Sequence, residues 1–150
     1  MSNHSESAFS VIGISVRTNN SVGGQDIGNL WAKFMGEDIF EKIPNKLSYD
    51  VYGIYTDYES DHTGDYTAIV GCPVSSLQEI PEGMISKTIP ASNYEIYTAT
   101  GKMPESVYGK WTEIWEDTAL ERTYKTDFEV YGAKSQNPMG AEVDIFIAVK

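Results

Sequence analysis

The chain of 150 residues has one cysteine and two histidines, and this scarcity argues against several classes of site. A single cysteine, Cys72, cannot form an internal disulfide, so nothing in the sequence indicates an oxidising compartment. His4 and His62 lie in polar stretches, and no helix-borne histidine pair or cysteine cluster indicates zinc. The sequence also offers no recognisable Ser-His-Asp or Cys-His pairing. We therefore expect no metal and no cofactor.

The sequence also lacks a long apolar segment. No run approaches the roughly 18 consecutive apolar residues of a membrane-spanning helix. Residues 1–7 are polar and lack the apolar core of a secretory signal. We predict a cytoplasmic protein that makes no membrane contact, in which residues 1–7 form a polar tail.

Basic residues are scarce as well. Eleven lysines and arginines stand against 22 acidic residues, which gives a net charge of −11. Such a chain repels a phosphate backbone, so we expect no direct contact with nucleic acid. The same negative charge attracts cations, although acidity often serves only to keep a protein soluble.

One feature that the sequence does contain is a repeated motif. Aromatic, acid, Val, Tyr and Gly occur at residues 49–53 and again, 79 positions later, at residues 128–132. A segment of that length cannot close a core alone, so two copies are expected to form one pseudo-symmetric domain. The groove between such halves is a common ligand site.

The spacing of apolar residues predicts the same order of elements in both halves. Period-two and β-branched stretches indicate strands, and three- and four-residue steps indicate helices. In the first half we expect a strand, a helix and two strands at residues 8–18, 25–43, 48–56 and 66–70. In the second half we expect strands at 84–89, 94–100, 128–131 and 143–149, with a helix beginning at Pro104.

Each half therefore reads as βαββ. We predict one α+β domain over residues 1–150, with pseudo-repeats at about 8–74 and 84–150. Its sheet should be twisted and mostly antiparallel, with two main helices flanking a ligand cleft.

The acids of the repeated motif are the first site candidates. Glu129 shares a strand face with Tyr131, and Asp50 shares one with Tyr52, because alternate residues of a strand point the same way. One acid surrounded by aromatic rings suits a flat, positively charged organic ligand. Alternation alone leaves open whether Glu129 faces the helices or lies solvated on the outer surface of the sheet. The side chain of Asp50 is shorter than that of Glu129 and reaches less far, so Asp50 is better suited to a surface role.

Aromatic residues at helical spacing are the second group of candidates. Trp31 in the first helix and Trp111 with Trp115 in the second occupy similar places in the two halves. Such stripes usually pack into a core. These three tryptophans can therefore either belong to the core or line the ligand cleft.

The second half resembles the gyrase-inhibitory-protein-like (GyrI-like) family, which supplies the effector-binding domain of some AraC-type and multidrug-responsive bacterial transcription regulators. The resemblance rests mainly on residues 83–149, and above all on the stretches 89–97, 111–115, 128–131 and 143–147. It implies a pair of βαββ units with a ligand cleft between the two helices. The chain lacks room for the helix-turn-helix domain of those regulators, so we expect a free-standing effector-binding domain.

The resemblance also implies roles for particular residues. In drug-binding members of the family, a buried acid pairs with a cationic ligand and aromatic residues line the cleft. The matching acid here is Glu129. The matching or pseudo-symmetric aromatic residues are Trp111, Trp115, Tyr131, Tyr94, Tyr97, Trp31 and Tyr52.

Three functions follow as alternatives. The first is capture of amphipathic, cationic aromatic small molecules in the cleft. The second is hydrolysis of reactive small molecules, because a buried Glu129 with a nearby tyrosine could activate water or protonate a leaving group. The third is a protein-partner role such as modulation of gyrase, in which the acidic chain would meet a basic partner.

Overall fold

The computed structural model of the protein describes residues 3–21, 23–60, 64–102, 105–117, 120–132 and 140–150. Pro104, where a helix was expected to begin, and His62 lie outside this description. The elements follow in chain order: β1 (Asn3–Glu6), β2 (Phe9–Thr18), α1 (Gly23–Gly36), α2 (Ile39–Lys42), β3 (Val51–Thr56), β4 (Tyr66–Val74), β5 (Ile85–Ile89), β6 (Ser92–Gly101), α3 (Glu105–Glu116), β7 (Thr126–Tyr131) and β8 (Ala141–Val149).

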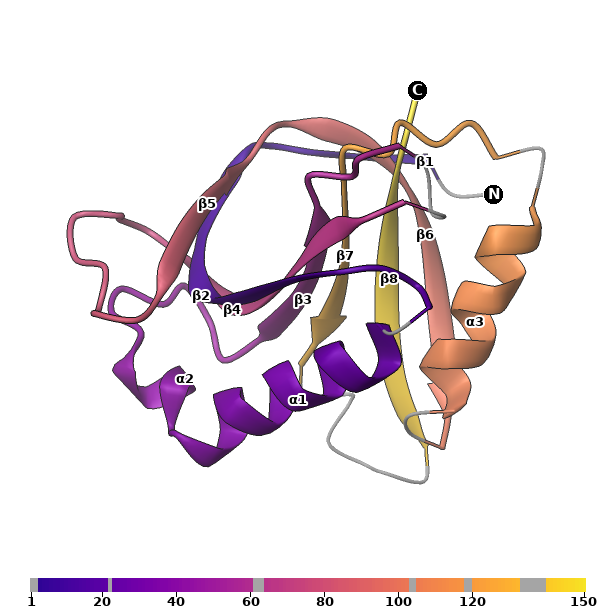
Figure 1. Ribbon diagram of the computed structural model, residues 1–150. Coiled ribbons are helices and arrows are strands. Elements are labelled where there is room, and N and C mark those ends of the chain that lie inside the picture. Colours follow the sequence, from indigo (N-terminus) through magenta and orange to yellow (C-terminus); the bar gives the residue numbers. More distant parts are fainter. Residues whose placement is uncertain (1–2, 22, 61–63, 103–104, 118–119, 133–139) are drawn as a thin grey trace.

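All the described strands join one antiparallel sheet in the order β1-β6-β8-β7-β3-β4-β2-β5. The units β2-α1-β3-β4 and β6-α3-β7-β8 meet where β3 pairs with β7. Figure 1 shows α1 below strands β3 and β7 and α3 beside β6 and β8, both outside the curve of the sheet. The predicted α+β class, the duplicated βαββ order and the antiparallel sheet are confirmed.

The two edge strands differ from the prediction. Asn3–Glu6, expected within a polar tail, forms β1 and pairs with β6 of the second unit. Ile85–Ile89, expected to open the second unit, forms β5 and pairs with β2 of the first. Each edge strand thus precedes one unit in the chain and pairs with the other. Backbone hydrogen bonds hold such a strand whatever its side chains, so the polar sequence of β1 gave no signal.

The first helical segment also departs from the prediction. A single helix over residues 25–43 was expected, whereas α1 ends at Gly36 and the short α2 begins at Ile39. Asp38 separates them in the left-handed conformation, with φ of 53°. Aspartate adopts this conformation more readily than most residues, so the chain changes direction there.

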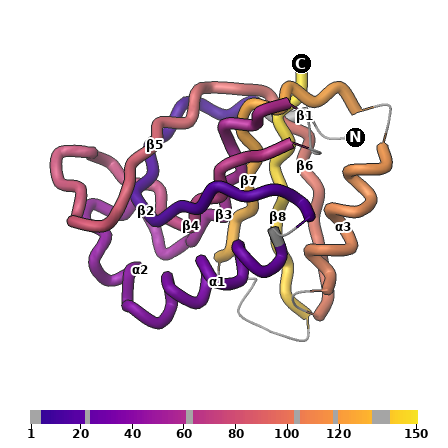
Figure 2. The backbone as a smooth tube through the Cα atoms, in the orientation of Figure 1, coloured from indigo at the N-terminus to yellow at the C-terminus, as the bar shows by residue number. Residues whose placement is uncertain are grey.

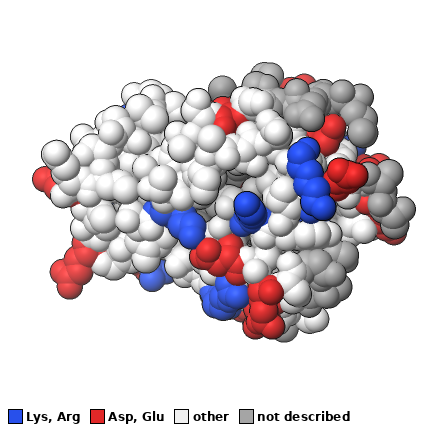
Figure 3. All heavy atoms as spheres, turned by 90° about the horizontal axis from the view of Figure 1, so that it is seen from above, with Lys and Arg blue, Asp and Glu red and all other residues white. Residues whose placement is uncertain are grey.

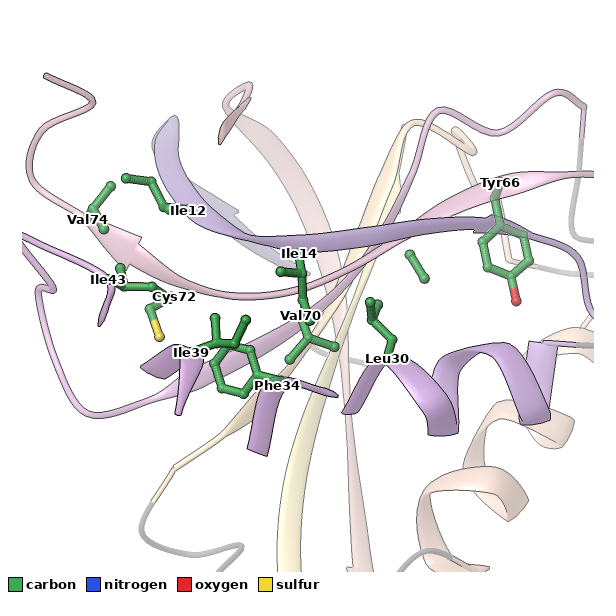
Figure 4. Packing of buried hydrophobic residues seen from close by; sticks show 11 residues of the cluster. Ile12, Ile14, Leu30, Phe34, Ile39, Ile43, Tyr66, Val70, Cys72 and Val74 are labelled. Atoms are coloured by element: carbon green, nitrogen blue, oxygen red, sulfur yellow. The ribbon is translucent and has the colours of Figure 1, made fainter. Parts of the chain in front are cut away.

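The helices cover one face of the sheet with two separate cores. Figure 4 shows the core under α1, where Leu30 and Phe34 pack on side chains of β2 and β4 such as Ile14 and Val70. Cys72 is buried in this core. The second core lies under α3, where Trp111 and other helix residues pack on β6 and β8. Because the two cores are separate, space remains between α1 and α3.

The opposite face of the sheet is buried as well. The sheet curls on itself (Figures 1 and 2), and side chains from β2 to β8 form a third core on its inner side. Phe128 lies at its centre, stacked on Phe146 with 4.6 Å between ring centroids and on Tyr52 with 5.3 Å. Phe128 and its neighbours in sequence are therefore buried on both sides of the strand.

A buried ion pair connects β7, β8 and the segment after α3. Arg122 Nη2 donates to Asp127 Oδ2 at 2.7 Å, and both side chains are almost fully buried. Asp127 Oδ2 also accepts from the Tyr58 hydroxyl at 2.6 Å, and its Oδ1 accepts from the backbone N–H of Ala148 at 2.7 Å. The aspartate is thus satisfied from three directions.

Replacing Asp127 by asparagine should destabilise the fold strongly. The change leaves the Arg122 charge buried without its counter-ion, which costs about 3–5 kcal/mol in comparable pairs. Asp57→Asn is the matched control, because Asp57 pairs with Lys87 at an exposed site and should cost at most about 1 kcal/mol. Urea unfolding at neutral pH measures both. Equal losses in the two variants would contradict a structural role for the buried pair.

Candidate functional site

A cavity of about 340 Å³ lies between α1 and α3, above strands β3, β4 and β7. Both helices, the three strands and three connecting segments contribute to its wall. The lining residues are Asn20, Gly24, Ile27, Gly28, Trp31, Tyr55, Tyr58, Tyr66, Val107, Tyr108, Trp111, Trp115, Arg122, Glu129 and Tyr131. The volume falls in the range of small-molecule sites, and most of the wall is aromatic or apolar.

Glu129 is the acid of this cavity. It faces the helices from β7 and is only 1% exposed. Its Oε1 accepts hydrogen bonds from the hydroxyls of Tyr131 at 2.6 Å and Tyr55 at 3.1 Å. Its Oε2 accepts from Trp111 Nε1 at 2.5 Å. β3, β7 and α3 therefore hold one carboxylate from three sides.

The backbone at Gly53 makes room for this carboxylate. Gly53 lies opposite Glu129 in the β3–β7 pair. A Cβ at Gly53 would stand 3.0 Å from Glu129 Oε1 and 3.7 Å from the Trp31 ring. Gly53 lies inside β3 and its φ is not positive, so the fold does not need a glycine there for its backbone conformation. Its absent side chain is what lets Glu129 and Trp31 approach β3.

Burial raises the pKa of Glu129 above its ordinary value, because the ionised form loses contact with water. The hydrogen bonds from Tyr131, Trp111 and Tyr55 oppose this by stabilising the carboxylate. Burial also raises the pKa of Tyr55 and Tyr131 well above 10, and the neighbouring Glu129 raises them further. Both tyrosines therefore stay protonated and act as donors to Glu129.

Aromatic rings surround the carboxylate. The Trp31 and Tyr131 rings meet edge to face with centroids 4.8 Å apart, and Tyr55 meets Trp111 in the same way at 5.4 Å. The ring centroids of Trp111 and Trp115 lie 6.3 Å apart. These contacts join α1 and α3 to the sheet around the cavity and fix the positions of the rings.

The structure brings together five of the eight predicted ligand residues. Glu129, Tyr131, Trp31, Trp111 and Trp115 all line the cavity. Tyr97 packs in the core under α3, and Tyr52 and Tyr94 belong to the core on the other face of the sheet.

The strand register explains the position of Tyr52. Tyr52 pairs with Val130 and Gly53 pairs with Glu129, and residues directly opposite each other share a face. The two copies of the motif therefore present opposite faces. Glu129 and Tyr131 point toward the helices, whereas Tyr52 points into the inner core. The expected equivalence of Asp50–Tyr52 with Glu129–Tyr131 was wrong in this respect.

Several residues that line the cavity were not predicted from the sequence. The main ones are Tyr55, Tyr58, Tyr66 and Arg122. Tyr55 could have been found, because it stands two residues after Gly53 and so shares the face of Glu129 once the register is known. Arg122 follows no motif and lies in an irregular segment. Its ion pair with Asp127 and a backbone bridge to Val149 position it at the cavity.

Neither a metal centre nor a membrane span is found within the described ranges. No three histidine, cysteine, aspartate or glutamate side chains there gather in a way that could hold a metal ion. No helix of those residues is long and apolar enough to cross a membrane.

Comparison with known proteins identifies relatives along nearly the whole chain. YobU of Bacillus subtilis, named as a candidate transcriptional regulator, is 30% identical over 144 residues, covering 92% of this chain and 90% of YobU. A solved integron cassette protein from the mobile metagenome of Vibrio cholerae is 35% identical, with a TM-score of 0.77 over 99% of this chain and 95% of that one.

A more distant solved structure shares the fold. SAV2435, solved bound to tetraphenylphosphonium, has a TM-score of 0.84 at 18% identity, over 99% of this chain and 93% of that one. Residues 5–149 match the Cass2 family, described as integron-associated effector binding protein. These matches and the observed βαββ pair confirm the GyrI-like resemblance, and the chain belongs to the family of integron-associated effector binding proteins.

Proposed function

We propose that the cavity binds small organic cations that carry aromatic or other apolar surface, with ionised Glu129 as their counter-charge. The observation that carries this proposal is the environment of Glu129. It is buried in the wall of a cavity, and among the described residues it has three hydrogen-bond donors but no cationic partner. A carboxylate offers about four acceptor sites, so one on Oε2 remains for a ligand or water.

The energetic argument favours a cation. Burial of an ionised carboxylate without a counter-ion is costly, and a bound cation offsets that cost. Phenol and indole rings also attract cations to their faces, and this attraction strengthens where water is excluded. Glu129 with Trp31, Trp111 and Tyr131 combines both effects in one place. Selection should rest on charge and flatness more than on detailed shape.

Arg122 does not oppose a cation strongly, because Asp127 neutralises it at 2.7 Å. The net charge of −11 favours cations at longer range. On the face drawn in Figure 3, acidic and basic side chains lie in small groups among uncharged residues, so no single acidic surface forms there. Glu129 is therefore the acid best placed to select a cation.

The relatives support the proposal. The structure of SAV2435 with tetraphenylphosphonium concerns a protein of the same fold and a ligand of the same class, an aromatic cation. Tetraphenylphosphonium is also a useful probe, because it carries a permanent charge that does not titrate.

The affinity for tetraphenylphosphonium should rise with pH and then level off. Protonated Glu129 is neutral and cannot offset the cation, and the pKa of Glu129 lies above its ordinary value. Affinity should therefore increase as pH passes upward through that raised pKa. In Glu129→Gln, binding should be weaker by about 1–3 kcal/mol at neutral pH and nearly independent of pH. Isothermal titration calorimetry from weakly acidic to neutral pH measures both.

Two controls accompany this experiment. Glu113→Gln removes the same charge from an exposed position of α3 and should leave the pH profile unchanged. Tetraphenylborate has the same shape with the opposite charge, so the wild type should bind it more weakly than tetraphenylphosphonium. An unchanged affinity and profile in Glu129→Gln would remove Glu129 from the mechanism.

A further inference from the structure

Two glycines of α1 face the cavity. Gly24 and Gly28 both line it, and they lie one helical turn apart on the same face of the helix. Gly28 lies inside α1, where glycine is a poorer helix former than any residue except proline. The helix is therefore weakened at the point where it borders the cavity.

Neither packing nor backbone conformation requires these two glycines. A Cβ at Gly24 or Gly28 would meet no heavy atom within 4 Å outside the backbone of its own helix. Neither residue has a positive φ. Gly53 differs in this respect, because a Cβ there would stand 3.0 Å from Glu129 Oε1. Because Gly24 and Gly28 line the cavity, the open space beside them is part of it.

The wall that α3 contributes is built of larger side chains. Val107, Tyr108, Trp111 and Trp115 all line the cavity from this helix. Tyr108 meets Trp115 edge to face with 6.3 Å between ring centroids, and Trp111 is fixed by its hydrogen bond to Glu129. The aromatic side chains of this wall are held by contacts, so the width of the cavity depends on what α1 places opposite them.

The thickness of a ligand decides whether that width matters. A flat aromatic cation fits a narrow gap between two walls. A cation whose rings point in different directions needs room on both sides of any one ring. A side chain on the cavity face of α1 would fill part of that room, and the bare backbone at Gly24 and Gly28 leaves it open.

We propose that Gly24 and Gly28 are specificity-determining residues, and that the space beside them admits bulky cations whose aromatic rings do not lie in one plane. This inference rests on the cation site of the proposed function and adds to it the size of the ligand. Glu129 supplies the counter-charge, and the bare face of α1 sets the thickness that the cavity accepts. A departure from helix propensity is expected at a functional site, and this one lies in the cavity wall.

Two permanent cations of different thickness test the role of the glycines. Tetraphenylphosphonium has rings that point in different directions, whereas N-methylquinolinium is flat. The wild type should bind both. In Gly28→Leu the affinity for tetraphenylphosphonium should fall about tenfold or more, because the added side chain overpacks the occupied cavity. The affinity for N-methylquinolinium should change by less than about threefold. Isothermal titration calorimetry measures both affinities.

The free variant should be more stable than the wild type, which separates lost binding from damage to the fold. Leucine is a better helix former than glycine, so Gly28→Leu should raise the melting temperature by about 2–4 °C. Gly109→Leu is the matched control, because Gly109 lies inside α3, is exposed and is not part of the cavity wall. It should raise the melting temperature similarly and keep both affinities. If Gly28→Leu does not fold, Gly28→Ala decides, with a loss of about twofold or more for tetraphenylphosphonium alone.

The outcomes separate this inference from the proposed function. If the wild type binds both cations through Glu129, as Glu129→Gln shows, and Gly28→Leu weakens neither or both equally, the cation site stands and the role of the glycines is overturned. Binding of the flat cation alone to the wild type would likewise overturn only the role of the glycines. Failure of both cations to bind the wild type would overturn the cation site, and this inference with it.

Discussion

The burial of one carboxylate is the constraint on which the site depends. Glu129 sits on a central strand, away from water, and three donors from β3, β7 and α3 surround it. Burial shifts the acid toward its neutral form, and the donors favour the ionised form. The balance leaves a group whose charge responds to its surroundings. Such a group is costly in a core, which points to a function rather than to packing.

The rest of the fold keeps that carboxylate in place without filling the space above it. Two βαββ units put α1 and α3 on the same face of one sheet, and each helix packs on its own set of strands. The separate cores leave a cavity between the helices rather than one continuous contact. The inner core around Phe128 holds the other face of β7, so the strand that carries Glu129 is fixed from both sides. Gly53 supplies the clearance that the side chains need.

The sequence was sufficient to predict the class of fold and the two βαββ units, and it singled out Glu129, which lies in the wall of the cavity. It was insufficient for the edge strands, because β1 is polar and a backbone-paired edge needs no hydrophobic pattern. It also could not settle the face of Glu129. Alternation distinguishes a buried face from a solvated one, and here both faces of β7 are buried. The family resemblance, rather than the pattern, favoured the correct face.

The remaining differences concern residues whose roles depend on register or on long-range contacts. Tyr52 repeats the position of Tyr131 in the motif, yet the β3–β7 register turns it to the opposite face. Arg122 is positioned at the cavity by its pair with Asp127 and a backbone bridge to Val149, and no local pattern indicates either contact. Tyr55 was not predicted, and Tyr52 was placed on the wrong face, for the same reason. The sequence does not show which residue of β3 lies opposite Glu129.

The most direct test of this account is an NMR titration of the Glu129 side-chain carboxyl, with and without saturating tetraphenylphosphonium. The account predicts a pKa above the ordinary value for glutamate in the free protein. Bound cation should lower that pKa, because proton binding and cation binding compete at one carboxylate. A pKa of Glu129 that stays the same when the cation saturates the protein would contradict the claim that this carboxylate is the counter-charge of the ligand.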